Sequence, residues 1–78
     1  MRISIAEAIA EEARYFGFEI EHLSNEYIIG TRNEVKFSLM KMDESMWRLG
    51  IRRADLVLLD ESGLTYAEVL KRLENHCV

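Results

Sequence analysis

At 78 residues the chain has room for one domain with a modest core, and we interpret residues 1–78 as a single domain. Its 49% apolar and 31% charged residues are typical of a globular protein and exclude a disordered chain. The net charge of −4 is uneven, because residues 1–34, 35–53 and 54–78 carry −4, +3 and −3. The middle of an acidic chain is therefore basic.

Targeting signals are not apparent in the sequence. No apolar run is long enough to cross a bilayer or to form a signal peptide, and Cys77 is the only cysteine. We therefore expect a cytoplasmic protein that has no internal disulfide and does not contact a membrane.

The first predicted element is a helix over residues 5–16. Ser4 and Glu7 have the spacing of a capping box, in which each side chain bonds a backbone N–H of the other residue. Gly17 stands where a left-handed C-terminal cap is expected. One face of the helix is apolar and is formed by Ile5, Ile9, Ala13 and Phe16, widened by Ala6 and Ala10.

Between residues 18 and 51 the apolar period changes to two, which predicts four half-buried strands. Short connections between them favour hairpins and a meander. The strand residues predicted to face the core are Phe18, Ile20, Tyr27, Ile29, Phe37, Leu39, Trp47, Leu49 and Ile51. A turn at residues 43–45 sets Leu39 opposite Leu49 and Phe37 opposite Ile51. It also sets Lys36 beside Arg52, Ser38 beside Gly50 and Met40 beside Arg48 on the other face.

The last third of the chain contains one ambiguous segment and one clear helix. The run Leu56–Leu59 within residues 54–63 fits a fifth strand or a helical turn, and we expect a short strand. Thr65 and Glu68 form a second capping box, which predicts a helix over residues 66–76. Leu64, before the cap, is placed to pack on Val69.

These elements predict an α+β fold. A four- or five-stranded antiparallel meander would carry both terminal helices on one face, and its uncovered edge could pair with a second copy to form a homodimer. The expected core consists of Ile5, Ile9, Phe16, Phe18, Ile20, Tyr27, Ile29, Phe37, Leu39, Trp47, Leu49, Ile51, Val69, Leu70 and Leu73.

The sequence offers little for catalysis. His22 and His76 lie near element ends, and Cys77 continues an apolar helix stripe. The pairs Asp43–Glu44 and Asp60–Glu61 fit turns better than a metal centre, which needs carboxylates from several elements. We therefore predict no catalytic residues, no metal and no cofactor.

A binding role requires fewer assumptions. The predicted partner-binding residues share the basic central region or the uncovered sheet face: Ile28, Lys36, Met40, Lys41, Met46, Arg48 and Arg52. Met and Arg beside an exposed aliphatic residue are typical of interface centres, and this charge favours a protein partner with an acidic patch. We expect a non-enzymatic inhibitor or adaptor, of the kind that phages and mobile elements use to cover a surface of host or defence machinery. The alternative is a domain that binds nucleic acid with the basic open sheet face.

Overall fold

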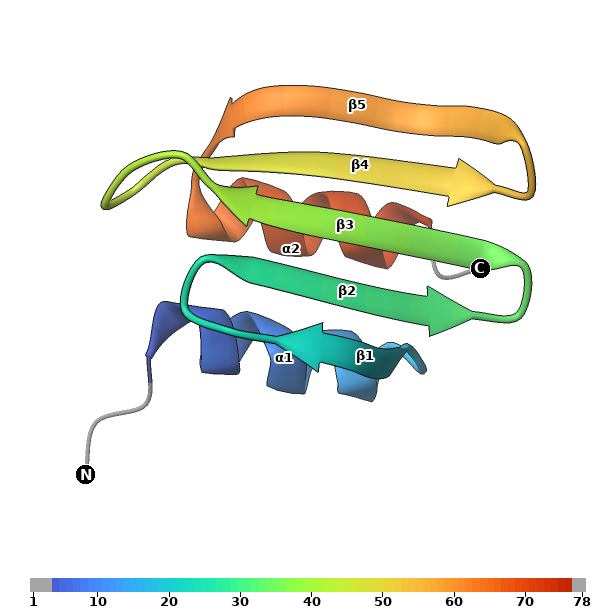
Figure 1. Cartoon of the computed structure of the whole chain (residues 1–78), viewed down its shortest axis with the longest axis horizontal. Coiled ribbons are helices and arrows are strands. Elements are labelled where there is room, and N and C mark those ends of the chain that lie inside the picture. The colour runs from blue at the N-terminus through green and yellow to red at the C-terminus, as the bar shows by residue number, and fades with distance from the viewer. Residues whose placement is uncertain (1–3, 77–78) are drawn as a thin grey trace.

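The computed structural model describes residues 4–76. In chain order the elements are α1 (Ile5–Tyr15), β1 (Glu19–Leu23), β2 (Tyr27–Arg32), β3 (Val35–Lys41), β4 (Trp47–Arg53), β5 (Leu56–Leu64) and α2 (Tyr66–Asn75). The strands pair in the order β1-β2-β3-β4-β5, all antiparallel, so the predicted meander is confirmed with five strands. Helix α1 packs against β1 and β2, and α2 packs against β4 and β5. Both helices therefore lie on one side of the sheet (Figure 1).

Both helices begin at the predicted caps. The Ser4 hydroxyl accepts a hydrogen bond from the backbone N–H of Glu7 at 3.1 Å. The Thr65 hydroxyl accepts from the N–H of Glu68, whose carboxylate accepts from the N–H of Thr65, so α2 has a full capping box. Gly17 follows α1 with a φ of +96°, as its predicted role as a left-handed cap requires. Each helix ends one residue earlier than predicted.

The predicted register of β3 and β4 is confirmed. The cross-strand pairs are Phe37–Ile51 and Leu39–Leu49 toward the helices, and Lys36–Arg52, Ser38–Gly50 and Met40–Arg48 on the other side. Asp43 closes the connection, because its carboxylate accepts from the backbone N–H groups of Ser45 at 2.9 Å and Met46 at 3.0 Å. Trp47 is 2% exposed, so it lies in the core as expected.

Strand β2 presents the opposite face to the one predicted. Ile28 is fully buried opposite Leu39, while Tyr27 and Ile29 lie half-buried on the side away from the helices. A connection of only two residues, 33 and 34, sets Gly30 opposite Phe37. The Phe37 ring occupies the space where a Cβ of Gly30 would lie. The core side of β2 therefore needs a glycine, and Ile28 follows it inward because strand residues alternate.

Helix α1 also differs from the prediction in one core residue. Ile5 is 48% exposed, although it was expected in the core. The buried residues of α1 are Ala6, Ile9, Ala10 and Ala13. At 100° per residue these four centre on a line about a quarter turn from Ile5, which therefore lies at the margin of the buried stripe.

Strand β5 resolves the ambiguity of residues 54–63. The segment is a strand of nine residues with a free edge, and its pairing with β4 shifts register at two places. Leu64, at its end, is buried in the core, and Leu58 and Leu59 pack partly against it. Leu56 and Val57 remain 64% and 57% exposed.

The core lies between the sheet and the two helices. Its buried residues are Ala6, Ile9, Ala13, Phe18, Ile28, Val35, Phe37, Leu39, Trp47, Leu49, Ile51, Leu64, Val69 and Leu73. The predicted core residues Phe16, Ile20 and Leu70 pack against this cluster but are only partly buried. Phe18, just before β1, meets Phe37 of β3 edge to face, with ring centroids 5.1 Å apart.

Candidate functional site

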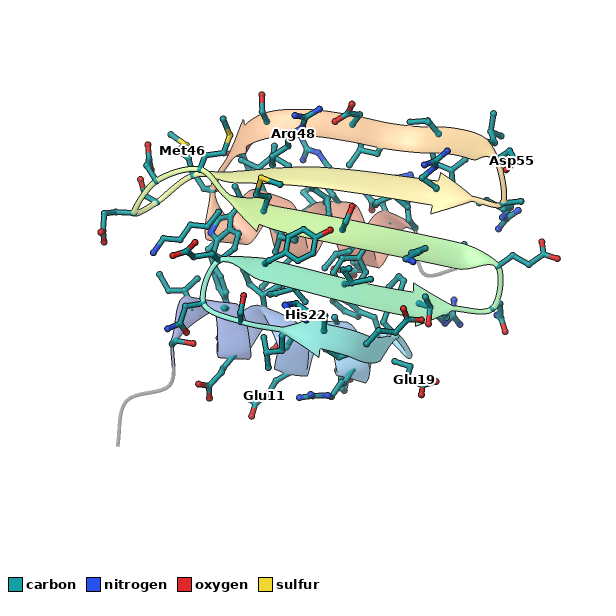
Figure 2. All side chains as sticks on the ribbon, viewed as in Figure 1. Glu11, Glu19, His22, Met46, Arg48 and Asp55 are labelled. Carbon is teal, nitrogen blue, oxygen red and sulfur yellow. The ribbon has the colours of Figure 1, made fainter. Side chains whose placement is uncertain are left out.

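The sheet side turned away from the helices is uncovered and faces the viewer in Figure 2. We call it the open face. Residues of β2, β3, β4 and β5 alternate onto it from strands whose other residues form the core. The open-face residues of these four strands include Tyr27, Ile29, Thr31, Lys36, Ser38, Met40, Arg48, Gly50, Arg52, Val57 and Asp60.

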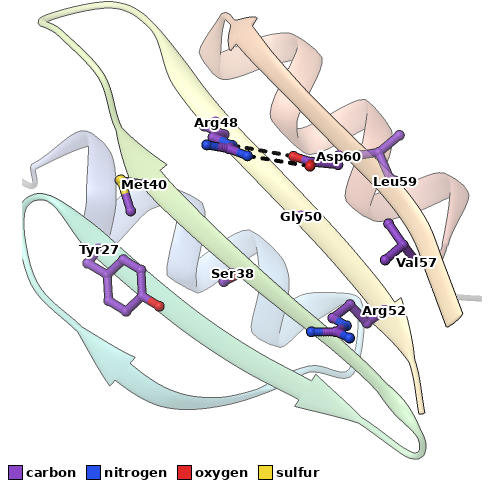
Figure 3. Close-up of a pocket in the computed structure, with 9 residues that line it drawn as sticks. All are labelled: Tyr27, Ser38, Met40, Arg48, Gly50, Arg52, Val57, Leu59 and Asp60. Carbon is purple, nitrogen blue, oxygen red and sulfur yellow. Dashed lines mark hydrogen bonds and ion pairs between the residues drawn. The ribbon is translucent and has the colours of Figure 1, made fainter. Parts of the chain in front are cut away.

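A shallow hollow of about 260 Å³ lies at the centre of the open face. Gly50 forms its floor and pairs with Ser38 on β3 and with Asp60 on β5. Tyr27 and Met40 stand on one side of this floor, and Val57 stands on the other (Figure 3). The hollow exists because the two smallest side chains of the face meet across the β3–β4 ladder while longer ones surround them.

Charged side chains lie at both ends of the hollow (Figure 3). At one end Arg48 pairs with Asp60, with Nε 3.3 Å from Oδ1 and Nη2 3.4 Å from Oδ2. At the other end Arg52 forms no ion pair with any acidic side chain of residues 4–76. Arg52 therefore presents a positive charge without an ion-pair partner among the described residues, beside an apolar surface.

The open face is less basic than the sequence of β3 and β4 indicates. The two edge strands supply acidic side chains: Glu21 on β1 lies 4.0 Å from Lys36, and Asp60 on β5 pairs with Arg48. These four side chains are all about half exposed, so the ion pairs contribute little to stability. Their main effect is to offset two of the three positive charges of the face.

The structure brings together four of the seven predicted partner-binding residues. Lys36, Met40, Arg48 and Arg52 share the open face. The expectation that Ile28 faces outward is wrong, since Ile28 is a core residue. The remaining two lie elsewhere. Lys41 is on the helix side of β3, where it lines a pocket with Trp47, and Met46 is half-buried in the β3–β4 connection.

Sequence reasoning did not place four of the residues that line the hollow, namely Tyr27, Val57, Leu59 and Asp60. Tyr27 was placed in the core because the run Tyr-Ile-Ile-Gly alternates equally well in either orientation. Val57, Leu59 and Asp60 were missed because residues 54–63 had no assigned face. The signal that could have found Tyr27 is the short connection between β2 and β3, because two residues there pair Tyr27 with Met40 on the open face.

The acidic pair Asp60–Glu61 lies within β5, so the prediction that it sits in a turn is wrong. His22 lies in β1, with its ring centroid 5.6 Å from that of Tyr27. His76 Nδ1 lies 2.9 Å from the carbonyl oxygen of Arg72, in the last turn of α2. Glu61 pairs with Arg72 at 3.2 Å, which ties β5 to α2. Cys77 lies outside the described residues. Within residues 4–76 no cluster of three or more His, Cys, Asp or Glu side chains could hold a metal ion.

Across the part of the chain that the structure describes, neither helix has the length and apolar character needed to span a membrane. No protein-family model matches the chain, and no curated protein or solved structure is significantly similar to it. The open face is therefore the feature from which a function is inferred.

Proposed function

We propose that this domain is a non-enzymatic protein-binding module that docks a partner protein on its open face. The observation that carries the proposal is an uncovered, partly apolar sheet face with a central hollow and an arginine that forms no ion pair among the described residues. Met40, which is 51% exposed, and Tyr27 supply the residue types that are enriched at interface centres, as does Arg52. The hollow is smaller than a typical small-molecule site, which favours a protruding side chain of a protein as its occupant.

The same face supports nucleic-acid binding less well. Two of its three bases have acidic partners, so fewer positive charges remain for phosphates. Trp47, the largest aromatic side chain, is buried and unable to stack on a base. The role of inhibitor or adaptor, a phage or mobile-element origin and a cytoplasmic location remain predictions from the sequence.

A second copy of the chain is another partner that we propose, at the free edge of β5. Edge strands expose unpaired backbone groups, and β5 adds the exposed side chains of Leu56 and Val57. Strand β1, at the other edge, is shorter, with five residues and a register shift, which makes it the poorer edge for pairing.

Affinity capture tests the main proposal. Tagged protein is incubated with lysate of the cells that encode it, with and without nuclease, and bound material is identified by mass spectrometry. We expect one stoichiometric protein that survives nuclease and is lost with the double variant Arg48→Glu, Arg52→Glu. Glu11→Lys, on the exposed side of α1, is the matched control and should retain the partner. Recovery of nucleic acid, or equal capture by the open-face variant, would contradict the proposal.

A further inference from the structure

Neither a left-handed backbone angle nor a steric clash requires a glycine at position 50. Gly50 lies in the middle of β4, where glycine weakens a strand because it loses more backbone entropy than other residues and packs nothing. Its φ is not in the left-handed region, unlike that of Gly17 or Gly63. A Cβ at Gly50 would lie 3.7 Å from the Ser38 hydroxyl oxygen and 4.0 Å from the Leu59 carbonyl oxygen, which are ordinary contacts.

Gly30 shows what a structural glycine looks like in the same sheet. It lies on the core side of β2, and a Cβ there would overlap the Phe37 ring. Gly50 has no such neighbour and faces outward into the hollow. Glycine within a strand often marks a place where a ligand or another backbone approaches closely. The missing side chain at position 50 therefore points to an occupant from outside the molecule.

The surroundings of Gly50 specify the chemistry of that occupant. Tyr27, Met40 and Val57 flank the floor, so the part of the occupant that enters is apolar. Arg48 is engaged by Asp60, whereas Arg52 at the other end has no acidic partner among the described residues. An arginine beside an apolar surface is best satisfied by a carboxylate, which it can bind through two parallel hydrogen bonds.

We propose that the hollow over Gly50 accepts one apolar side chain of a partner protein, while Arg52 pairs with a carboxylate next to that side chain in the partner. The inference rests on the proposed function and gives it a recognition rule, namely a large apolar residue near Asp, Glu or a chain terminus. The floor at Gly50 sets the depth of the contact, and Arg52 sets the orientation of the segment.

The test uses random short peptides displayed on phage and selected on the immobilised full chain. Peptides that share an apolar residue close to a carboxylate are expected, and a synthetic copy of the strongest binder serves as the probe. Gly50→Leu, which fills the hollow, should weaken its binding by roughly tenfold or more. Arg52→Gln should weaken it roughly three- to tenfold. Arg53→Gln is the matched control, because Arg53 lies toward His76 and away from the hollow, and it should have no effect.

The variants separate failure of this inference from failure of the proposed function. Circular dichroism must show that Gly50→Leu is folded, and Gly50→Thr, with a strand-favouring side chain, replaces it if it is not. In one outcome Gly50→Leu abolishes peptide binding, but the peptide needs no carboxylate and Arg52→Gln has no effect. That outcome would overturn the inference, while the proposal that the open face binds a protein would stand. If neither Gly50→Leu nor Gly50→Thr affects peptide binding, both this inference and the proposed binding on the open face would be overturned. The inference would also be overturned if the selection yields no peptide that binds the wild type more tightly than Gly50→Leu.

Discussion

At the scale of single residues, we predict opposite effects on stability for substitutions at Gly30 in β2 and Gly50 in β4. Gly30→Ala should destabilise the fold by about 1–3 kcal/mol, because the new Cβ displaces the Phe37 ring in a packed core. Gly50→Ala should be neutral or stabilise by up to about 1 kcal/mol, because its Cβ finds ordinary contacts and reduces the entropy of the unfolded chain. Urea unfolding of both variants measures the difference, and equal effects would show that the Phe37 contact is wrong.

Among residues 4–76, two non-glycine residues adopt left-handed backbone conformations, each in the connection after a strand. Asn33 has a φ of +56° and Ala54 a φ of +52°. Asparagine tolerates this region well, whereas alanine pays a steric penalty of about 1–2 kcal/mol. Ala54→Asn should therefore stabilise the protein by roughly 0.5–1 kcal/mol and Asn33→Ala should destabilise it by a similar amount. Thermal unfolding of the two variants tests these opposite signs, and shifts in the same direction would contradict the argument.

At the scale of elements, the cap of α2 gives a pH dependence. The backbone N–H of Thr65, and next its hydroxyl, hold the pKa of Glu68 below its ordinary value of about 4.5, with a further contribution from Arg72. The carboxylate therefore binds a proton more readily in the unfolded chain than in the folded one. Its contribution to stability is fully present above about pH 4.5 and is lost as the pH falls through the lower, folded-state pKa.

Glu68→Gln tests this dependence. Glutamine can keep a hydrogen bond to the cap but does not titrate, so we expect a lower Tm than wild type at pH 7 and a gap that narrows toward pH 3. Glu11→Gln, on the exposed side of α1, is the control and should not reproduce the narrowing. A gap that is constant with pH would show that the cap carboxylate does not carry the effect.

Elements also differ in how far their sequence determined them. The β3–β4 hairpin was predicted in register because Asp43 marks its turn and large apolar residues alternate without interruption on both sides. Strand β2 was predicted with the wrong face because Tyr27 and Ile28 are adjacent and both apolar, so either could face the core. Which of them does so depends on the fit of the Phe37 ring over Gly30. That fit is a contact between strands, which no pattern within one strand contains.

The candidate site was predicted correctly in the β3–β4 hairpin and missed in the strands on either side of it. Lys36, Met40, Arg48 and Arg52 belong to the hairpin whose register the sequence determines, and they were found. Tyr27 and Asp60 come from the flanking strands, whose faces depend on tertiary packing and on the register shifts of β5. The balance of charge on the open face could not be read from the basic central segment, because Glu21 and Asp60 reach it from outside that segment.

At the scale of the whole molecule, the free edge of β5 predicts self-association. Sedimentation of the wild type should show a fraction of dimer that increases with protein concentration. Edge pairing would join two copies through backbone hydrogen bonds and through the exposed Leu56. Leu56→Lys should shift the equilibrium toward monomer, because a charged side chain at an edge opposes pairing. Leu23→Lys, at the β1 edge, is the matched control and should leave it unchanged. A wild-type monomer at all concentrations would contradict the prediction.

The meander order also has a consequence for how the chain folds. Each strand pairs only with its neighbour along the sequence, so the sheet can be assembled from hairpins that close short loops, at a small entropic cost for each. The contact between α1 and α2 is different, because it joins the two ends of the domain. Topologies rich in local contacts fold quickly, and contacts between distant segments form at the greatest entropic cost. The docking of α1 beside α2 is thus the step expected to limit the folding rate, and substitutions at Ile9 should slow folding more than substitutions in the β3–β4 turn.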